Sequence, residues 1–179
     1  MTRRVLMVGA TGMLRPAVHA LTHRGHSVTA VSRQPGRATP PSTIPGEFTA
    51  VSADWRDPES LTDAVADAAH GHLFPTAVVW VHSPYRVAVM RGLARLLTAD
   101  AVVVQVWGSA SHDPRDVLDS QGVDLPGRTM CHVMLGYVRL AGISRWLSSA
   151  EISDGVVHAL DAAEPVHVVG RIDPWQQRP

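Results

Sequence analysis

The sequence predicts one doubly wound α/β domain over residues 1–179, with a mostly parallel sheet of about seven strands. Apolar runs of roughly four to eight residues alternate along the chain with segments of helical periodicity, the pattern of a parallel sheet covered by helices. Hydrophobic residues make up 45% of the chain and charged residues 18%, which favours a packed core over a disordered chain. The length fits one domain.

The first half of the chain contains four short apolar segments that we predict to be strands. They are residues 5–8, 27–31, 48–51 and 76–81. Helices are expected at 16–24, 59–69 and 86–97, where apolar residues recur at helical spacing. Gly25 should end the first of these helices. Pro58 should start the second, because the first turn of a helix does not need its missing N–H.

The second half continues with a strand at 101–107 and then changes character. Residues 108–128 are rich in glycine, proline and charged residues and contain only a short helical segment at 116–120. We therefore predict that they form a loop on the side of the sheet where the substrate binds. A strand is expected at 130–138 and another at 166–169. Between them, Ser148 or Ser149 together with Glu151 predicts a capped helix that continues to Leu160.

The charge content excludes several classes of function. The 16 basic and 16 acidic residues cancel, which argues against binding of nucleic acid or of an anionic membrane surface. All 16 basic residues are arginine. Any mechanism that needs a lysine amine, such as a Schiff base or a Tyr-Lys proton relay, is therefore excluded.

The cysteine, the apolar runs and the histidines of the sequence bear on its compartment, on membrane spans and on metal binding. The single cysteine, Cys131, cannot form an internal disulfide and lies in an apolar run, so we expect a buried thiol and a reducing cytoplasm. No apolar run approaches the roughly 18–20 residues that span a bilayer. His19 and His23 lie one helical turn apart without a further ligand at metal-binding spacing, and we predict no metal site.

A glycine-rich turn follows the first strand. The segment runs Gly9-Ala-Thr11-Gly12-Met13-Leu14 and leads into a helix. A diphosphate needs backbone N–H groups that it can approach without side chains in the way, and the positive end of a helix dipole. This turn offers both, so we predict that it binds the pyrophosphate of a dinucleotide. The alternative is a turn that only connects strand to helix.

This motif resembles that of the short-chain dehydrogenase/reductase superfamily, in particular its atypical members with Gly-Ala-Thr-Gly at this position. The resemblance covers most of the chain, from Arg4 to about Gly170, and implies a Rossmann domain that binds NAD(P). One position departs from the pattern, because Arg15 stands where a third glycine would fall. Arg15 implies a slightly displaced helix or an arginine near the phosphates.

The end of the second strand indicates which nicotinamide cofactor is used. An acidic residue there would bind the ribose 2′-hydroxyl and repel a 2′-phosphate. Ser32 is followed instead by Arg33 and, nearby, Arg37, whose forked donors suit a phosphate, so we predict NADP. The alternative is a solvated patch of charge.

Two further pairs of residues complete the cofactor site that the resemblance implies. Asp54 and Trp55 follow the third strand, where the family contacts adenine, although Asp54 could equally start a turn. His82 and Ser83 follow the fourth strand and should border the nicotinamide ribose and ring.

The catalytic residues of most family members are absent from this chain. Those members place a lysine shortly after a tyrosine, but the residue four positions beyond Tyr85 is Val89, and the one four beyond Tyr137 is Ala141. Ser109 matches the family's catalytic serine. We expect Ser109, His112 and Tyr137 to act as polar groups that orient a substrate.

Two kinds of function remain. One is NADPH-dependent hydride transfer to a small imine, enone or flavin-like acceptor, since the stretch from Ser109 to Pro114 is similar to that of the small biliverdin and flavin reductases. The other is non-redox use of NADP, as a sensor resembling NmrA or as a cyclase or isomerase. A small-molecule substrate is expected in the enzymatic case. A homodimer could form through the apolar helix at 86–97.

Overall fold

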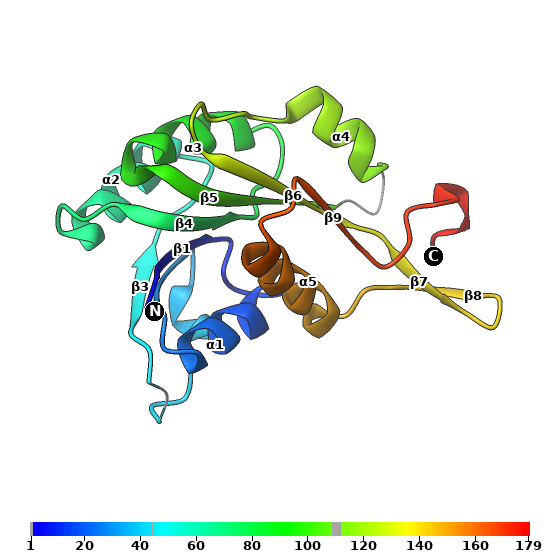
Figure 1. The fold of residues 1–179 in the computed structure, drawn as a ribbon, viewed down its shortest axis with the longest axis horizontal. Coiled ribbons are helices and arrows are strands. Elements are labelled where there is room, and N and C mark those ends of the chain that lie inside the picture. The colour runs from blue at the N-terminus through cyan, green and yellow to red at the C-terminus, as the bar shows by residue number, and fades with distance from the viewer. Residues whose placement is uncertain (1, 44, 109–111) are drawn as a thin grey trace.

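The computed structural model describes residues 2–43, 45–108 and 112–179. Within them, seven strands form one sheet in which every pairing is parallel (Figure 1). The strand order is β3-β2-β1-β4-β5-β6-β9. The strands are β1 (Arg4–Val8), β2 (Ser27–Ser32), β3 (Phe48–Ser52), β4 (Phe74–Val79), β5 (Leu97–Trp107), β6 (Thr129–Leu135) and β9 (Val166–Val169). The predicted doubly wound α/β fold is confirmed.

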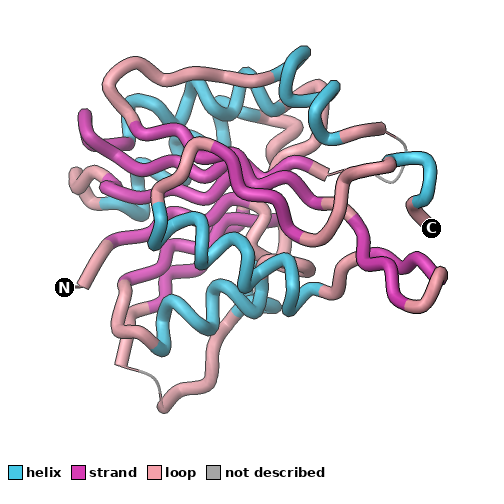
Figure 2. Tube along the Cα trace, turned by 45° about the vertical axis from the view of Figure 1, so that its right-hand side comes forward, coloured by secondary structure: helices cyan, strands magenta, loops and turns pink. Residues whose placement is uncertain are grey.

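Helices cover both faces of this sheet. One face carries α1 (Arg15–His23) and α5 (Ser149–Ala162), which pack against each other. The opposite face carries α2 (Pro58–Ala69), α3 (Arg86–Leu93) and α4 (Pro114–Gln121) (Figure 2). Short 3₁₀ turns occur at Pro35–Ala38, Ala94–Leu96 and Trp175–Gln177. In the described part of the chain, no helix is both long and apolar enough to cross a bilayer.

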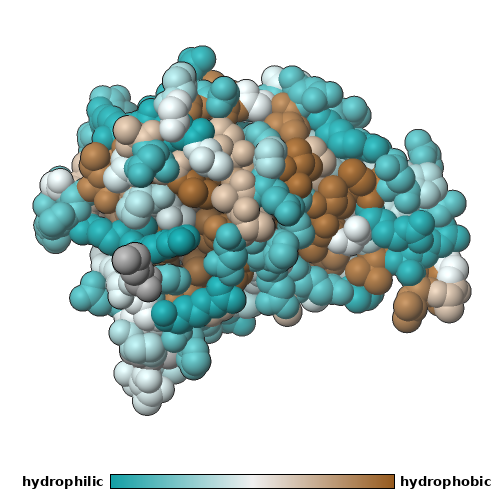
Figure 3. Space-filling model, in the orientation of Figure 1, coloured by the Kyte–Doolittle hydropathy of each residue, from teal (hydrophilic) through white to brown (hydrophobic). Residues whose placement is uncertain are grey.

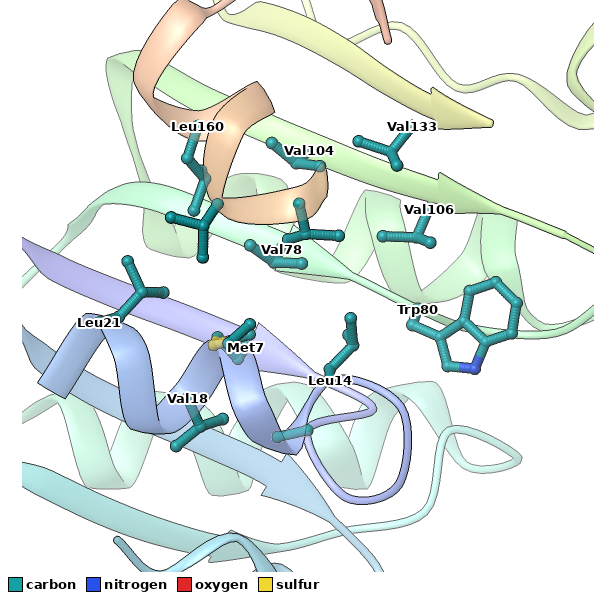
Figure 4. Close-up of a cluster of buried hydrophobic side chains, with 14 of the residues drawn as sticks. Met7, Leu14, Val18, Leu21, Val78, Trp80, Val104, Val106, Val133 and Leu160 are labelled. Atoms are coloured by element: carbon teal, nitrogen blue, oxygen red, sulfur yellow. The ribbon is translucent and has the colours of Figure 1, made fainter. Parts of the chain in front are cut away.

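The core consists of one buried cluster on each side of the sheet. Apolar side chains of the inner strands meet α1 and α5 on one side and α2 and α3 on the other. Figure 4 shows the first cluster, with Trp80 at its edge just beyond the C-terminal end of β4. Strands that are buried on both faces explain the continuous apolar runs in the sequence.

The predicted helix at 86–97 is shorter in the structure. α3 ends at Leu93, and after one 3₁₀ turn Leu97 already belongs to β5, where it pairs with Phe74 of β4. Sheet pairing therefore overrides the helical spacing of these leucines. Val89, Met90 and Leu93 are buried in the domain's own core, so this apolar side is not free to form the dimer face that we expected there.

The predicted strand at 130–138 is broken at Gly136. A Cβ at Gly136 would lie 2.0 Å from the carbonyl oxygen of Arg171, so only glycine allows the two segments to pass this closely. The chain then forms an antiparallel hairpin of β7 (Tyr137–Leu140) and β8 (Ile143–Trp146), which the sequence analysis missed. Hydrophobic atoms mark its tip in Figure 3, where Leu140 and Ile143 are exposed.

The N-terminus of α5 confirms the predicted cap. The hydroxyl of Ser148 accepts a hydrogen bond from the backbone N–H of Glu151, and the Glu151 carboxylate accepts one from the backbone N–H of Ser148. Arg145 donates two further hydrogen bonds to this carboxylate, both of 2.9 Å. Together these donors lower the pKa of Glu151 to about 2, with Arg145 as the largest cause.

We expect the contribution of this ion pair to stability to depend on pH. Because the folded-state pKa is depressed, the contribution is complete above the ordinary pKa of 4.5 and is lost as pH falls toward 2. Glu151→Gln keeps the capping geometry but removes the charge. Its urea midpoint should lie below that of the wild type at pH 6 and approach it at pH 3. If the difference between the two urea midpoints is the same at pH 6 and pH 3, the charge of Glu151 does not contribute to stability.

Candidate functional site

The glycine turn lies where the strand order of the sheet reverses, between β1 and β4. Gly9 follows β1 with φ +82°, and its N–H donates to the carbonyl of Val31 over 2.9 Å. A Cβ on Gly9 would lie 2.4 Å from the carbonyl oxygen of Trp80. Gly9 therefore permits a close approach of two strands, and its own N–H is used within the fold.

The next residues of the turn supply the open donors. Within the described residues, the backbone N–H groups of Thr11, Gly12 and Met13 make no hydrogen bond, and they directly precede α1. Ser153 of α5 donates to the Met13 carbonyl over 2.7 Å and so ties this loop to a second helix. Leu14 is fully buried and packs in the core. The result is a cluster of N–H groups at the positive end of a helix.

A first cavity of about 390 Å³ opens beside this turn, at the C-terminal ends of β1 to β4. Its walls therefore come from four neighbouring strands and the loops that follow them. The lining residues are Val8, Gly9, Thr11, Val31, Ser32, Arg33, Gln34, Arg37, Ala53, Leu61, Trp55 and Trp80. Ligands of open α/β sheets bind in this crevice, beyond the carboxyl ends of the strands.

Two arginines give the first cavity its charge. Arg33 and Arg37 both line it, both are exposed, and neither forms an ion pair with another described residue. No acidic residue appears among the described lining residues. Ser32 is buried at the end of β2, where its hydroxyl accepts a hydrogen bond from the Gln34 N–H. The cavity is therefore suited to an anionic group at the end of β2.

Of the two residues predicted to contact adenine, Trp55 lines the first cavity and Asp54 does not. Trp55 lines the first cavity, and its ring meets that of His82 edge-on, with centroids 5.6 Å apart. Asp54 is not among the lining residues, because its carboxylate accepts hydrogen bonds from the backbone and guanidinium of Arg56. These bonds lower the pKa of Asp54. Asp54 therefore has the contacts of a residue that starts a turn, and the adenine contact stays a prediction.

Two further depressions extend the first cavity along the strand ends. One, on the surface, is lined by Gly12, Met13, Arg15, Arg37 and Ser149. The other, of about 280 Å³, is lined by Met13, Trp80, His82, Gly108, Leu135, Gly136, Trp146, Leu147 and Ile152. Arg37 is common to the first cavity and the surface depression, and Met13 to the two depressions. The three hollows thus adjoin one another, and Thr11, Gly12 and Met13 are among the residues that line them.

No protein-family model and no curated protein matches this chain. Solved structures do match it. A short-chain dehydrogenase from Sphingobium yanoikuyae in complex with NADPH aligns with a TM-score of 0.70 and 14% identity, over 93% of this chain and 87% of that one. The fold is that of the short-chain dehydrogenase/reductases.

Two other structures support the same fold. A short-chain dehydrogenase/reductase from Serratia marcescens aligns with a TM-score of 0.70 and 16% identity, over 94% of this chain and 96% of that one. The MalC reductase/Diels-Alderase from Malbranchea aurantiaca aligns with a TM-score of 0.71 and 12% identity, over 94% of each chain.

On the short-chain dehydrogenase/reductase fold, His82 and Ser83 follow β4 near the carboxyl ends of the strands, and of the two His82 lines a hollow described above. His82 lines the 280 Å³ depression, and its ring meets that of Trp80 edge-on at 5.1 Å. Burial, followed by the charge of Arg86, lowers the pKa of His82. Ser83 donates a hydrogen bond to the Gln121 side chain. Burial and the Arg86 charge both favour the neutral form of the His82 imidazole beside this depression.

The three residues predicted to be catalytic differ in position. Ser109 lies outside the described residues. His112 is exposed and borders a further cavity beside α4. Tyr137 is fully buried, and its hydroxyl donates to the carbonyl of Pro174 over 2.6 Å. The contact of Tyr137 fastens the C-terminal tail, and Tyr137 lines none of the three hollows described above.

The sequence analysis did not single out Trp80, Arg86 or Trp146. Trp80 looked like the end of a buried strand, and Arg86 like the start of a helix. Their position in the sequence could have identified Trp80 and Arg86, because both follow β4 at the edge of the sheet where ligands bind. Trp146 belongs to the unpredicted hairpin. Among the described residues, no three His, Cys, Asp or Glu side chains gather in a way that could hold a metal ion.

Proposed function

We propose that this chain is an NADP(H)-dependent oxidoreductase that transfers hydride to a small imine, enone or flavin-like acceptor. The observation that carries the proposal is the first cavity, where, among the described residues, Arg33 and Arg37 form no ion pair and no acidic residue lines the wall. A ribose 2′-phosphate would be favoured there by two guanidinium groups. The NADPH complex of the Sphingobium structure supports a nicotinamide nucleotide on this fold.

The residues present fit such a nucleotide. The close approach at Gly9 leaves no room for a side chain, and the N–H groups of Thr11, Gly12 and Met13 are open to a pyrophosphate. Trp55 offers an aromatic edge to the adenine. The bound nucleotide would supply the hydride. The chain's own contribution would be to hold the acceptor beside His82, with His112 and Ser109 as polar groups that orient it.

A second candidate function is binding of NADP without redox chemistry, as a sensor, cyclase or isomerase. It is favoured by the absence of lysine, which removes the proton relay of ordinary carbonyl reduction. The MalC structure also carries the words reductase and Diels-Alderase in its name, so this fold occurs in a protein described by both reaction types.

Turnover of NADPH separates the two candidates. The purified chain is incubated with NADPH and a panel of cyclic imines, enones and flavins, and loss of the nucleotide absorbance is followed. We expect oxidation with at least one class of acceptor. Tight binding of NADPH without oxidation by any of them would favour the second candidate, and failure to bind either nicotinamide nucleotide would refute both.

Ser109→Ala tests the predicted catalytic serine. The substitution should lower kcat while leaving the Kd for NADPH within about twofold, since the serine is expected at the acceptor and not at the phosphates. Removing one hydrogen-bond donor from a reacting group typically costs roughly tenfold or more in rate. Ser60→Ala, at an exposed position on α2 that lines none of the cavities described here, is the control. An unchanged kcat would remove Ser109 from the site.

The proposal includes a small-molecule partner and a location in the cytoplasm. The location is supported by cysteine usage, since the one cysteine of the chain, Cys131, is a free buried thiol. A homodimer stays a prediction without an assigned surface.

A further inference from the structure

Arg86 is a buried cation at the start of α3. Its side chain is among the most buried charged groups of the described chain, at 4% exposed. The Nη1 atom donates to the carbonyl of Val106 over 3.0 Å, and the guanidinium lies 3.8 Å from the ring centroid of Trp107. The Nε atom is buried without a partner. Most of the five N–H donors of this group are therefore unused within the described residues.

No carboxylate in the described part of the chain pairs with this charge. Burial lowers the pKa of Arg86 to about 10, so the group is still protonated at pH 7. The charge of Arg86 also lowers the pKa values of His82 and His132, where it is the second cause after burial of the imidazoles. A buried charge without a counterion is costly, and proteins usually supply a partner.

Arg86 lines a cavity of about 340 Å³ beside the C-terminal ends of β4 and β5. The other described lining residues are His82, Ser83, Gly108, His112, Asp116, Val117, Ser120 and Gln121. His82 and Gly108 also line the 280 Å³ depression, so the two hollows adjoin. The one acidic lining residue, Asp116, is exposed on α4 and forms no ion pair with Arg86.

We propose that Arg86 binds a carboxylate of the substrate in this cavity. The inference rests on the proposed function and narrows its acceptor to a small molecule that carries an acidic group. A guanidinium presents paired N–H donors that match the two oxygens of a carboxylate. Because the cavity adjoins the predicted nicotinamide end, a carboxylate held here would place the rest of a small acceptor beside His82.

A ligand-binding experiment on the full chain tests the site without turnover. The probes are acetate and benzoate, each compared with its uncharged amide. The readout is the indole N–H resonance of Trp107, assigned with Trp107→Phe, because this ring lies against Arg86 and its Nε1 donates to His132. We expect saturable shifts with the carboxylates at concentrations at least tenfold lower than with the amides.

Variants at Arg86 separate ligand binding from a purely structural role. Arg86→Met should abolish the preference for carboxylates, whereas Arg86→Lys should keep part of it. Arg91→Met, an exposed arginine on the same helix, should bind like the wild type. Equal binding of acids and amides by the wild type, or full retention of the preference in Arg86→Met, would overturn the proposal. If Arg86→Met fails to fold, the wild-type comparison and Arg86→Lys decide the question.

A separate titration with NADPH distinguishes this inference from the proposed function. A wild-type chain that binds NADPH but shows no preference for carboxylates refutes the role of Arg86 alone. A chain that prefers carboxylates but binds no nicotinamide nucleotide supports the carboxylate site while refuting the proposed oxidoreductase.

Discussion

Arg33→Asp is expected to move nucleotide preference from NADPH toward NADH. The substitution removes a guanidinium from the first cavity and places a carboxylate at the end of β2, where it would repel a 2′-phosphate and accept a hydrogen bond from a ribose hydroxyl. A hydrogen bond to a charged group is worth about 1.5–3 kcal/mol, so the Kd for NADPH should rise by roughly 10- to 100-fold. Titration of both nucleotides measures the change.

The matched control for this prediction is Arg91→Asp. It makes the same change of charge at an exposed position on α3 that lines none of the cavities described above. Its effect on the ratio of the two Kd values should be small, because exposed charges at a distance are screened by salt. If Arg33→Asp leaves the ratio as it is in the wild type, the phosphate assignment fails and Arg33 belongs to a solvated patch.

Gly9→Ala should be strongly destabilising and should weaken nucleotide binding. The new Cβ would meet the Trp80 carbonyl at 2.4 Å, so β1 and β4 would have to separate where their ends form the first cavity. The residue also has φ +82°, which alone costs an alanine roughly 1–2 kcal/mol. We therefore expect a loss of about 3 kcal/mol or more, on the scale of overpacking added to backbone strain. Urea unfolding measures the stability.

Gly12→Ala separates the two causes. Gly12 also has a positive φ, +90°, but a Cβ there would meet nothing within 4 Å. Its substitution should therefore cost only the strain of the backbone, and less than Gly9→Ala. Equal losses in the two variants would mean that the approach of Trp80 to Gly9 is relaxed at little cost, and that this contact does not shape the cavity.

The parts of the site that sequence reasoning predicted are those with local causes. Glycines after an apolar strand imply a backbone turn with free N–H groups, and Arg33 follows the next strand by chain connectivity alone. Asp54 shows the limit of this reasoning. The carboxylate of Asp54 pairs with the exposed side chain of its neighbour Arg56, and no motif encodes this pairing. Tyr137 likewise has the right chemistry for catalysis, but its partner Pro174 lies far along the chain.

By itself, the sequence determined the alternation of strands and helices, the parallel sheet and the glycine turn, because periodicity, capping and glycine's backbone freedom act over a few residues. Only the tertiary structure decided where 130–138 breaks, since the constraint on Gly136 comes from Arg171. It also decided that Arg86 is buried beside a cavity, with no acidic partner among the residues that the structure describes. Burial and pairing of charge depend on contacts between distant segments, which a linear pattern does not record.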